Sequence, residues 1–105
     1  MALDVYWLRR AEDKLEDIYY YYSLKAGEQI AQSLVNGIVD KTISMRNHPK
    51  VGQVELELSH RVEEFRYLVY KNYKILYWIN YKEGRIEIVN IFDTRQNPVK
   101  INPSS

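Results

Sequence analysis

Three basic residues in the second half of the chain lie within or directly after segments that have the composition of strands. Arg66 lies inside one apolar segment, Lys74 lies inside the next, and Arg95 comes directly after the last. A basic side chain within an apolar strand must reach solvent or be paired, because burying an isolated charge is costly. On an uncovered sheet face such side chains could hold a phosphate, with each arginine gripping two of its oxygens. Structural ion pairs, for example between Arg95 and Asp93, account equally well for the same spacing.

Two nearby residues could supply a general base beside these cations. An imidazole is the side chain most often used to move protons near neutral pH, although the position of His60 in a loop also fits an ordinary surface residue. Asp93 precedes Arg95 by two positions, so both side chains lie on one side of a continuing strand. We expect Asp93 to hold Arg95 in place rather than to act as the base. The candidate catalytic residues are therefore Arg66, Arg95, Asp93 and His60.

The composition excludes several classes of site. The chain has no cysteine, so it has neither a disulfide nor a thiolate metal site. Its two histidines have no acidic residue at ligand spacing, and the sequence contains no glycine-rich phosphate loop and no G-x-S-x-G motif. We therefore predict neither a metal nor a cofactor. No apolar stretch approaches the roughly 20 residues of a membrane span, which predicts a soluble, cytoplasmic protein without membrane contact.

The hydrophobic periodicity predicts how these residues are positioned within a single domain, residues 1–105. Residues 3–7 predict a strand, and apolar residues at spacings of three and four from Leu8 predict an amphipathic helix that ends at Gly27. A second helix must stop before Pro49, because the residue preceding a proline is pushed out of the helical region. Three further strands are predicted at 64–70, 73–81 and 85–93, with turns short enough for antiparallel hairpins.

This β-α-α-β-β-β order predicts an α+β domain, in which a helical hairpin packs on one face of an antiparallel sheet. The strand at 73–81 is apolar on both faces, so it should lie at the centre of the sheet. The other sheet face is expected to remain uncovered. Gly37 lies inside the second predicted helix, where glycine costs about 1 kcal/mol relative to alanine, and a close contact between the two helices would account for it.

In four segments the chain resembles the RelE/ParE superfamily, the toxins of bacterial type II toxin–antitoxin modules. The segments are DKLEDIYYYY in the first helix, HPKVG after the second, RYLVYKNYKILYWI over the central hairpin, and IEIVNIFDTRQNP at the end. The resemblance implies a toxin that a cognate antitoxin neutralises. In the RNA-cleaving members, basic residues on the sheet and near the C-terminus are catalytic. Arg66 and Arg95 match two arginines of that pattern, and Lys74 occupies a position where an arginine often follows a tyrosine.

The resemblance leaves the cellular target open. The first hypothesis is a metal-independent endoribonuclease that cleaves mRNA on the ribosome, with Lys50, Arg61 and Lys74 contacting the nucleic acid. The second is a ParE-type poison of DNA gyrase with no active site of its own, and the third is an inactive relative that only binds its antitoxin. The paired arginines favour the first hypothesis narrowly. The sequence pI of about 7.9 and the absence of a terminal Tyr or His after Arg95 favour the other two.

Overall fold

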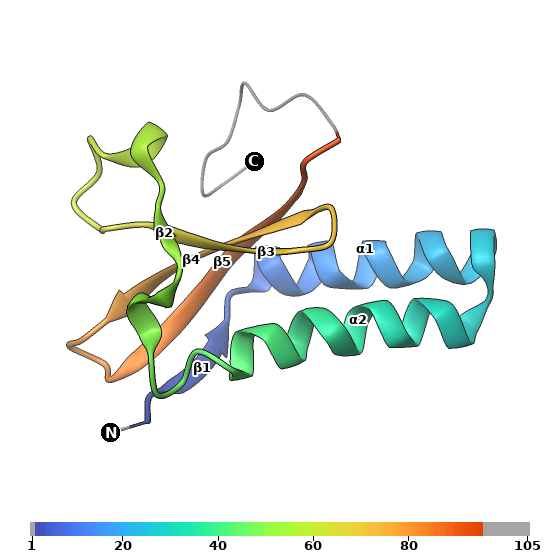
Figure 1. Ribbon diagram of the computed structural model, residues 1–105, viewed down its shortest axis with the longest axis horizontal. Coiled ribbons are helices and arrows are strands. Elements are labelled where there is room, and N and C mark those ends of the chain that lie inside the picture. The colour runs from blue at the N-terminus through green and yellow to red at the C-terminus, as the bar shows by residue number, and fades with distance from the viewer. Residues whose placement is uncertain (1, 96–105) are drawn as a thin grey trace.

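The structure, a computed structural model, describes residues 2–95 as a helical hairpin packed on a five-stranded sheet (Figure 1). The strands are β1 (Asp4–Trp7), β2 (Gln53–Val54), β3 (Arg66–Tyr70), β4 (Tyr73–Asn80) and β5 (Arg85–Asp93). The helices are α1 (Arg9–Ala26) and α2 (Glu28–Ile43), and short 3-10 turns cover Pro49–Val51 and Leu56–Leu58. The predicted α+β class is confirmed. The short strand β2 and the two 3-10 turns are additions that the sequence pattern did not indicate.

The sheet has the strand order β1-β5-β4-β3-β2, so β4 occupies the predicted central position. The pairs β3–β4 and β4–β5 are antiparallel, as predicted, and so is β2–β3. In contrast, β1 runs parallel to β5, with Asp4 opposite Arg85. The physical reason is the path of the chain. The helical hairpin connects β1 to β2 at the opposite edge of the sheet. The antiparallel strands β2 to β5 then lead back across the sheet, and β5 pairs with the inner edge of β1.

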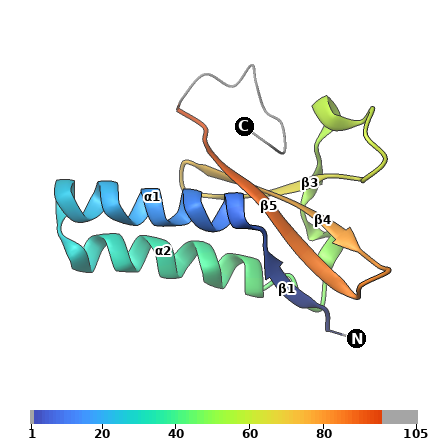
Figure 2. The same cartoon turned by 180° about the vertical axis from the view of Figure 1, so that it is seen from behind.

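The two helices form a hairpin around a single glycine. Gly27 has a φ of 98°, ends α1 as predicted, and is followed directly by α2. Ala11 and Ile18 are on the side of α1 that packs on the sheet. The far end of the hairpin projects beyond the sheet (Figures 1 and 2), and there Tyr20 and Tyr21 are exposed. Neither described helix is long and apolar enough to cross a membrane.

The described residues form two hydrophobic clusters, one on each side of the sheet. The larger cluster lies between sheet and helices and includes Ile38 of α2 and Tyr77 of β4. The smaller cluster lies on the other face, where Leu58 and Phe65 pack against Leu76. The prediction that this face would be uncovered is therefore wrong over Leu76, because the segment between β2 and β3 folds back across it. Apolar residues in that segment have no regular spacing, so periodicity gave no sign of the cover.

Gly37 of α2 is explained by a strand and not by the neighbouring helix. A Cβ atom at this position would collide with the Tyr70 hydroxyl of β3. The predicted cause, a close contact between the helices, is therefore wrong, although the close approach itself is present. Tyr70 packs partly buried against the larger cluster, with its ring end over the backbone of Gly37.

Candidate functional site

Arg66 is the first residue of β3, where it pairs with Tyr77 of β4. Its Nη1 donates hydrogen bonds to the carbonyl oxygens of Gly52 at 2.9 Å and Lys50 at 3.2 Å, and its Nη2 donates to Glu64 at 2.8 Å. The side chain is only 15% exposed. Alternation along the strand places it on the face that carries the helices. Arg66 therefore fastens the loop after α2 to the sheet.

Tyr77 holds the same loop from the neighbouring strand. Its hydroxyl donates to the carbonyl oxygen of Pro49 at 2.7 Å and accepts from the backbone N–H of Gly52 at 2.9 Å. A Cβ atom at Gly52 would lie 2.7 Å from the carbonyl oxygen of Tyr67, closer than packing allows. Burial raises the pKa of the Tyr77 hydroxyl. The loop over Arg66 is thus anchored by side chains and by a backbone approach that only glycine permits.

Lys74 is on the opposite face of the sheet from Arg66. Its ammonium group lies 3.0 Å from a carboxylate oxygen of Glu55 and 3.9 Å from the centre of the Tyr67 ring. The Glu55 side chain is 6% exposed and that of Lys74 is 17% exposed, so the ion pair is nearly buried. Removing one partner of a buried pair leaves an uncompensated charge at high cost. Lys74 therefore secures the segment between β2 and β3, as Arg66 secures the loop before it.

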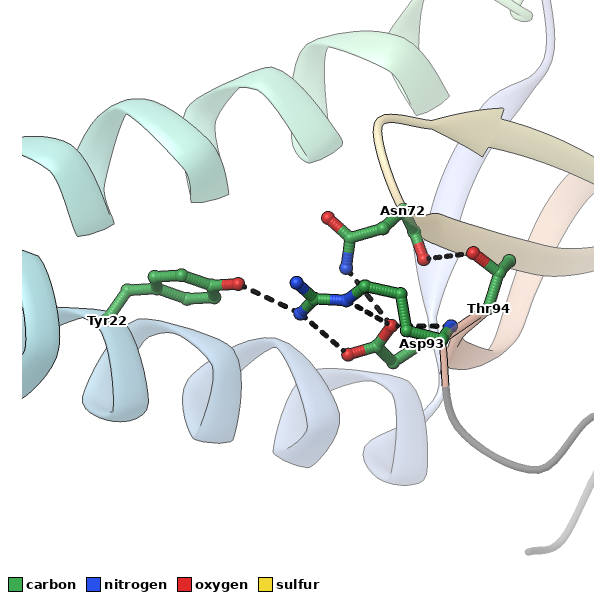
Figure 3. Close-up of polar contacts among 5 residues, drawn as sticks. Tyr22, Asn72, Asp93 and Thr94 are labelled. Atoms are coloured by element: carbon green, nitrogen blue, oxygen red, sulfur yellow. Dashed lines mark hydrogen bonds and ion pairs between the residues drawn. The ribbon is translucent and has the colours of Figure 1, made fainter.

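Arg95 lies just past β5, in a polar cluster between the strand tip and α1. Figure 3 shows Tyr22 reaching from α1 towards Asp93, and Asn72 approaching from the β3–β4 turn. Asp93 accepts hydrogen bonds from Nε of Arg95 at 3.2 Å, from its Nη2 at 3.1 Å and from its backbone N–H at 3.0 Å. The Nη2 group also donates to the Tyr22 hydroxyl at 3.2 Å. The expected pairing of Asp93 with Arg95 is present, and the Arg95 side chain is 61% exposed.

The electrostatics of this cluster follow from its hydrogen bonds. The hydrogen bonds from Arg95 lower the pKa of Asp93 to about 2, against the opposing effect of burial. The hydroxyl of Tyr73 and then Arg95 lower the pKa of Tyr22. Burial, followed by the hydrogen bond to Tyr22, raises the pKa of Tyr73 to about 12. Asp93 is thus ionised at neutral pH and poorly suited to accept a proton, which agrees with a positioning role.

The structure brings Arg95 and Asp93 together but does not join all four candidate catalytic residues in one site. Arg66 lies opposite Tyr77 and Asp93 opposite Tyr73, so four positions of β4, about 13 Å at the usual rise per strand residue, separate them along the sheet. His60 is exposed in the bend between the second 3-10 turn and β3. The predicted nucleic-acid contacts are also dispersed, with Arg61 exposed beside His60, Lys50 exposed in the first 3-10 turn, and Lys74 paired on the far face. Among residues 2–95, no three His, Asp or Glu side chains are placed to hold a metal ion.

Sequence reasoning missed three residues that build these sites. Glu55 neutralises Lys74, Tyr22 receives a hydrogen bond from Arg95, and Asn72 donates to Asp93 at 3.1 Å. Glu55 and Lys74 are 19 positions apart, a separation that periodicity cannot pair. Periodicity and turn composition give no sign of the polar contacts of Tyr22 and Asn72 either, because tertiary structure creates them.

This arrangement of elements matches a solved toxin–antitoxin structure. The chain is similar to the structure titled "Chromosomal ParDE TA system from P. aeruginosa", with a TM-score of 0.71 over 88% of this chain and 96% of that chain. The sequence identity is 20%, so this likeness shows the fold alone. The fold of the chain is therefore that of this structure, a helical hairpin on a mostly antiparallel sheet.

The family follows from the sequence match. The model of the family described as "ParE toxin of type II toxin-antitoxin system, parDE" matches residues 5–98, and the chain belongs to this family. No curated protein matches the chain. A parDE system consists of a toxin and its antitoxin, so the predicted class and the cognate antitoxin, a ParD protein, are both supported.

Proposed function

We propose that this ParE-family toxin stops growth by binding DNA gyrase, and that it does not cleave RNA. The main support for the proposal is that the two cations on the sheet, Arg66 and Lys74, already have structural partners. Arg66 donates to two backbone carbonyls and Glu64, and Lys74 is paired with the nearly buried Glu55. A phosphate could recruit either cation only by breaking contacts that hold the protein together.

The positions of the candidate residues also fit phosphodiester cleavage poorly. The reaction requires cations within hydrogen-bond reach of the phosphorane oxygens and a base within reach of the attacking hydroxyl, so all of them must surround one phosphodiester. Arg66 and Arg95 are at different positions along the sheet, about four residues of β4 apart, and His60 is exposed in the irregular segment that precedes β3. Binding to a protein target makes no such demand, since an exposed arginine such as Arg95 can serve at the rim of an interface.

mRNA cleavage remains the second candidate because of one observation in the Arg95 cluster. Tyr22 has a lowered pKa and lies 3.2 Å from an exposed guanidinium, so the two groups could together accept a proton and stabilise a phosphorane. In this alternative Asp93 would position Arg95, and Arg66 would have no chemical role.

The experiment separates the two candidates with purified protein and with cells. Gyrase is assayed for supercoiling with the wild-type toxin, with Arg95→Ala, and with Arg9→Ala as a control for an exposed arginine on α1. We expect the wild type and Arg9→Ala to inhibit supercoiling, Arg95→Ala to inhibit it more weakly, and transcripts in induced cells to stay intact. Fragmented transcripts with normal supercoiling would establish the RNA-cleaving alternative. Growth without arrest and with normal supercoiling would show an inactive relative that only binds its antitoxin.

A further inference from the structure

A small pocket lies where the helical hairpin meets the β3–β4 turn, beside the Arg95 cluster. Its volume is about 340 Å³, and it is lined by Tyr22, Ile30, Ser33, Leu34, Lys71 and Asn72. None of the sequence-based site predictions includes Lys71 or Ser33. The pocket combines an apolar part from α2 with polar groups from three separate elements, which is the usual composition of a specific binding site.

Tyr22 presents a hydrogen-bond donor to this pocket. Its hydroxyl oxygen accepts a hydrogen bond from Arg95 Nη2 at 3.2 Å. A tyrosine hydroxyl offers one hydrogen and a limited set of lone pairs. With its oxygen already accepting from Arg95, Tyr22 has its O–H left to donate. A ligand that meets Tyr22 must therefore be an acceptor.

Lys71 supplies the charge. It is exposed, has a φ of 53°, and lies with its ammonium group 5.8 Å from the centre of the Tyr70 ring. A positive φ is uncommon for a residue other than glycine, so the backbone of the turn adopts a restricted conformation at this lysine. In the part of the chain that the structure describes, no carboxylate forms an ion pair with it, unlike Lys74 and Arg95. Its charge is uncompensated.

The residues in and beside the pocket determine its net charge. Asn72 is held by three hydrogen bonds, one from its side chain to Asp93 and two accepted by its carbonyl oxygen from Thr94. Asp93 and Arg95 neutralise each other. Lys71 therefore leaves one positive charge, which suits a single carboxylate better than a doubly charged phosphate. Ile30 is 56% exposed beside it and could be covered by an apolar side chain next to that carboxylate.

We propose that this pocket binds one acidic side chain of the ParD antitoxin, with an apolar neighbour of that side chain covering Ile30. The carboxylate would receive hydrogen bonds from Lys71, the Tyr22 hydroxyl and the Ser33 hydroxyl. The contact would join α1, α2 and the β3–β4 turn through one partner residue. This inference rests on the antitoxin that the family implies, and it is independent of whether gyrase or RNA is the target of the toxin.

The test compares two lysines in equivalent places. Lys71 is in the β3–β4 turn and Lys82 is in the β4–β5 turn, and both are exposed. Asparagine adopts positive φ more readily than most residues, so Lys71→Asn removes the charge and keeps the turn. We expect Lys71→Asn to weaken binding of the purified cognate antitoxin roughly tenfold or more, the usual scale for one hydrogen bond to a charged group, and Lys82→Asn to leave it within about twofold. The loss should shrink at about 1 M salt, where charges are screened within about 3 Å.

Further variants make the result decisive. Ser33→Ala should weaken antitoxin binding by a smaller factor without lowering the melting temperature. One acidic-to-amide variant of the antitoxin should reproduce the loss caused by Lys71→Asn and add nothing to it in the double mutant. Binding within twofold of wild type for both Lys71→Asn and Ser33→Ala would overturn the proposal. The proposal would also be overturned if these variants lost affinity for a short single-stranded RNA or duplex DNA while antitoxin binding was unchanged. The pocket would then be a nucleic-acid site.

Discussion

Arg66 and Arg95 are the same residue type on the same sheet, yet their surroundings give them opposite properties. Arg66 is 15% exposed and donates mainly to backbone carbonyls, whereas Arg95 is 61% exposed and is paired with one carboxylate. Backbone acceptors in an anchored loop cannot move aside for a ligand. The Arg95–Asp93 pair can rearrange, since the exposed guanidinium is readily solvated when it leaves the carboxylate. The resemblance to RNA-cleaving toxins treats the two arginines alike, and only their neighbours tell them apart.

The same contrast separates the two ends of the sheet. At the Arg66 end, Tyr77, Gly52 and Lys50 surround the guanidinium, and nothing in that arrangement depends on a partner molecule. At the Arg95 end, polar groups from α1, the β3–β4 turn and β5 converge on a surface that is open to solvent. We therefore expect a functional surface of this protein at the tip of β5. Substitutions at the two ends should therefore affect different measurements.

The largest expected effect on stability is that of Arg66→Ala. It leaves the carbonyl oxygens of Gly52 and Lys50 without their donor, and an unsatisfied, partly buried acceptor costs about 1–3 kcal/mol. We expect the free energy of unfolding to fall by about 2–3 kcal/mol in urea denaturation. The remaining folded protein should inhibit gyrase normally. Arg66→Lys should recover part of the stability. An unchanged urea midpoint for Arg66→Ala would show that Arg66 does not stabilise the fold and so does not differ from Arg95 in this respect.

An intermediate effect is expected for Asp93→Asn, and it depends on pH. The folded-state pKa of Asp93 is lowered to about 2 from an ordinary 3.8, so its ionised form stabilises the folded protein above about pH 4. That stabilisation is lost as the pH falls from about 4 to about 2. Asp93→Asn should lower the melting temperature at pH 7 by less than Arg66→Ala does. Its stability should also depend less on pH across this acid window, as melting curves recorded between pH 2 and pH 7 would reveal.

The smallest effect on stability should come from Arg95→Ala, because that side chain is mostly solvated. We expect a modest fall in melting temperature at pH 7, no larger than that of Asp93→Asn because Asp93 keeps its hydrogen bond from Asn72, and a clear loss of gyrase inhibition. In an NMR titration, the pKa of Asp93 should move up towards its ordinary value, since the hydrogen bonds from Arg95 are the main cause of its lowering. A large fall in stability with full activity would reverse the roles assigned to the two ends of the sheet.

Much of the fold was predictable because its signals are local. The spacing of apolar residues from Leu8 predicted α1, and Gly27 predicted its end. The strand at 85–93 was predicted with the bounds that β5 has, and β4 was placed at the centre because it is apolar on both faces. At the candidate site, the pairing of Asp93 with Arg95 was also predictable, since two positions along a strand point the same way.

The sequence by itself determined the helices, the hairpins and the family, because periodicity, turn residues and ordered segments are properties of neighbouring positions. Tertiary structure alone decided that Lys74 is neutralised by Glu55, that Arg66 is held by a loop, and that Lys71 stands beside Tyr22. Each of these outcomes depends on an irregular segment or a turn meeting a distant element. Such contacts are set by the distances and faces of the folded chain, and no spacing along the sequence encodes which cation is left without a partner.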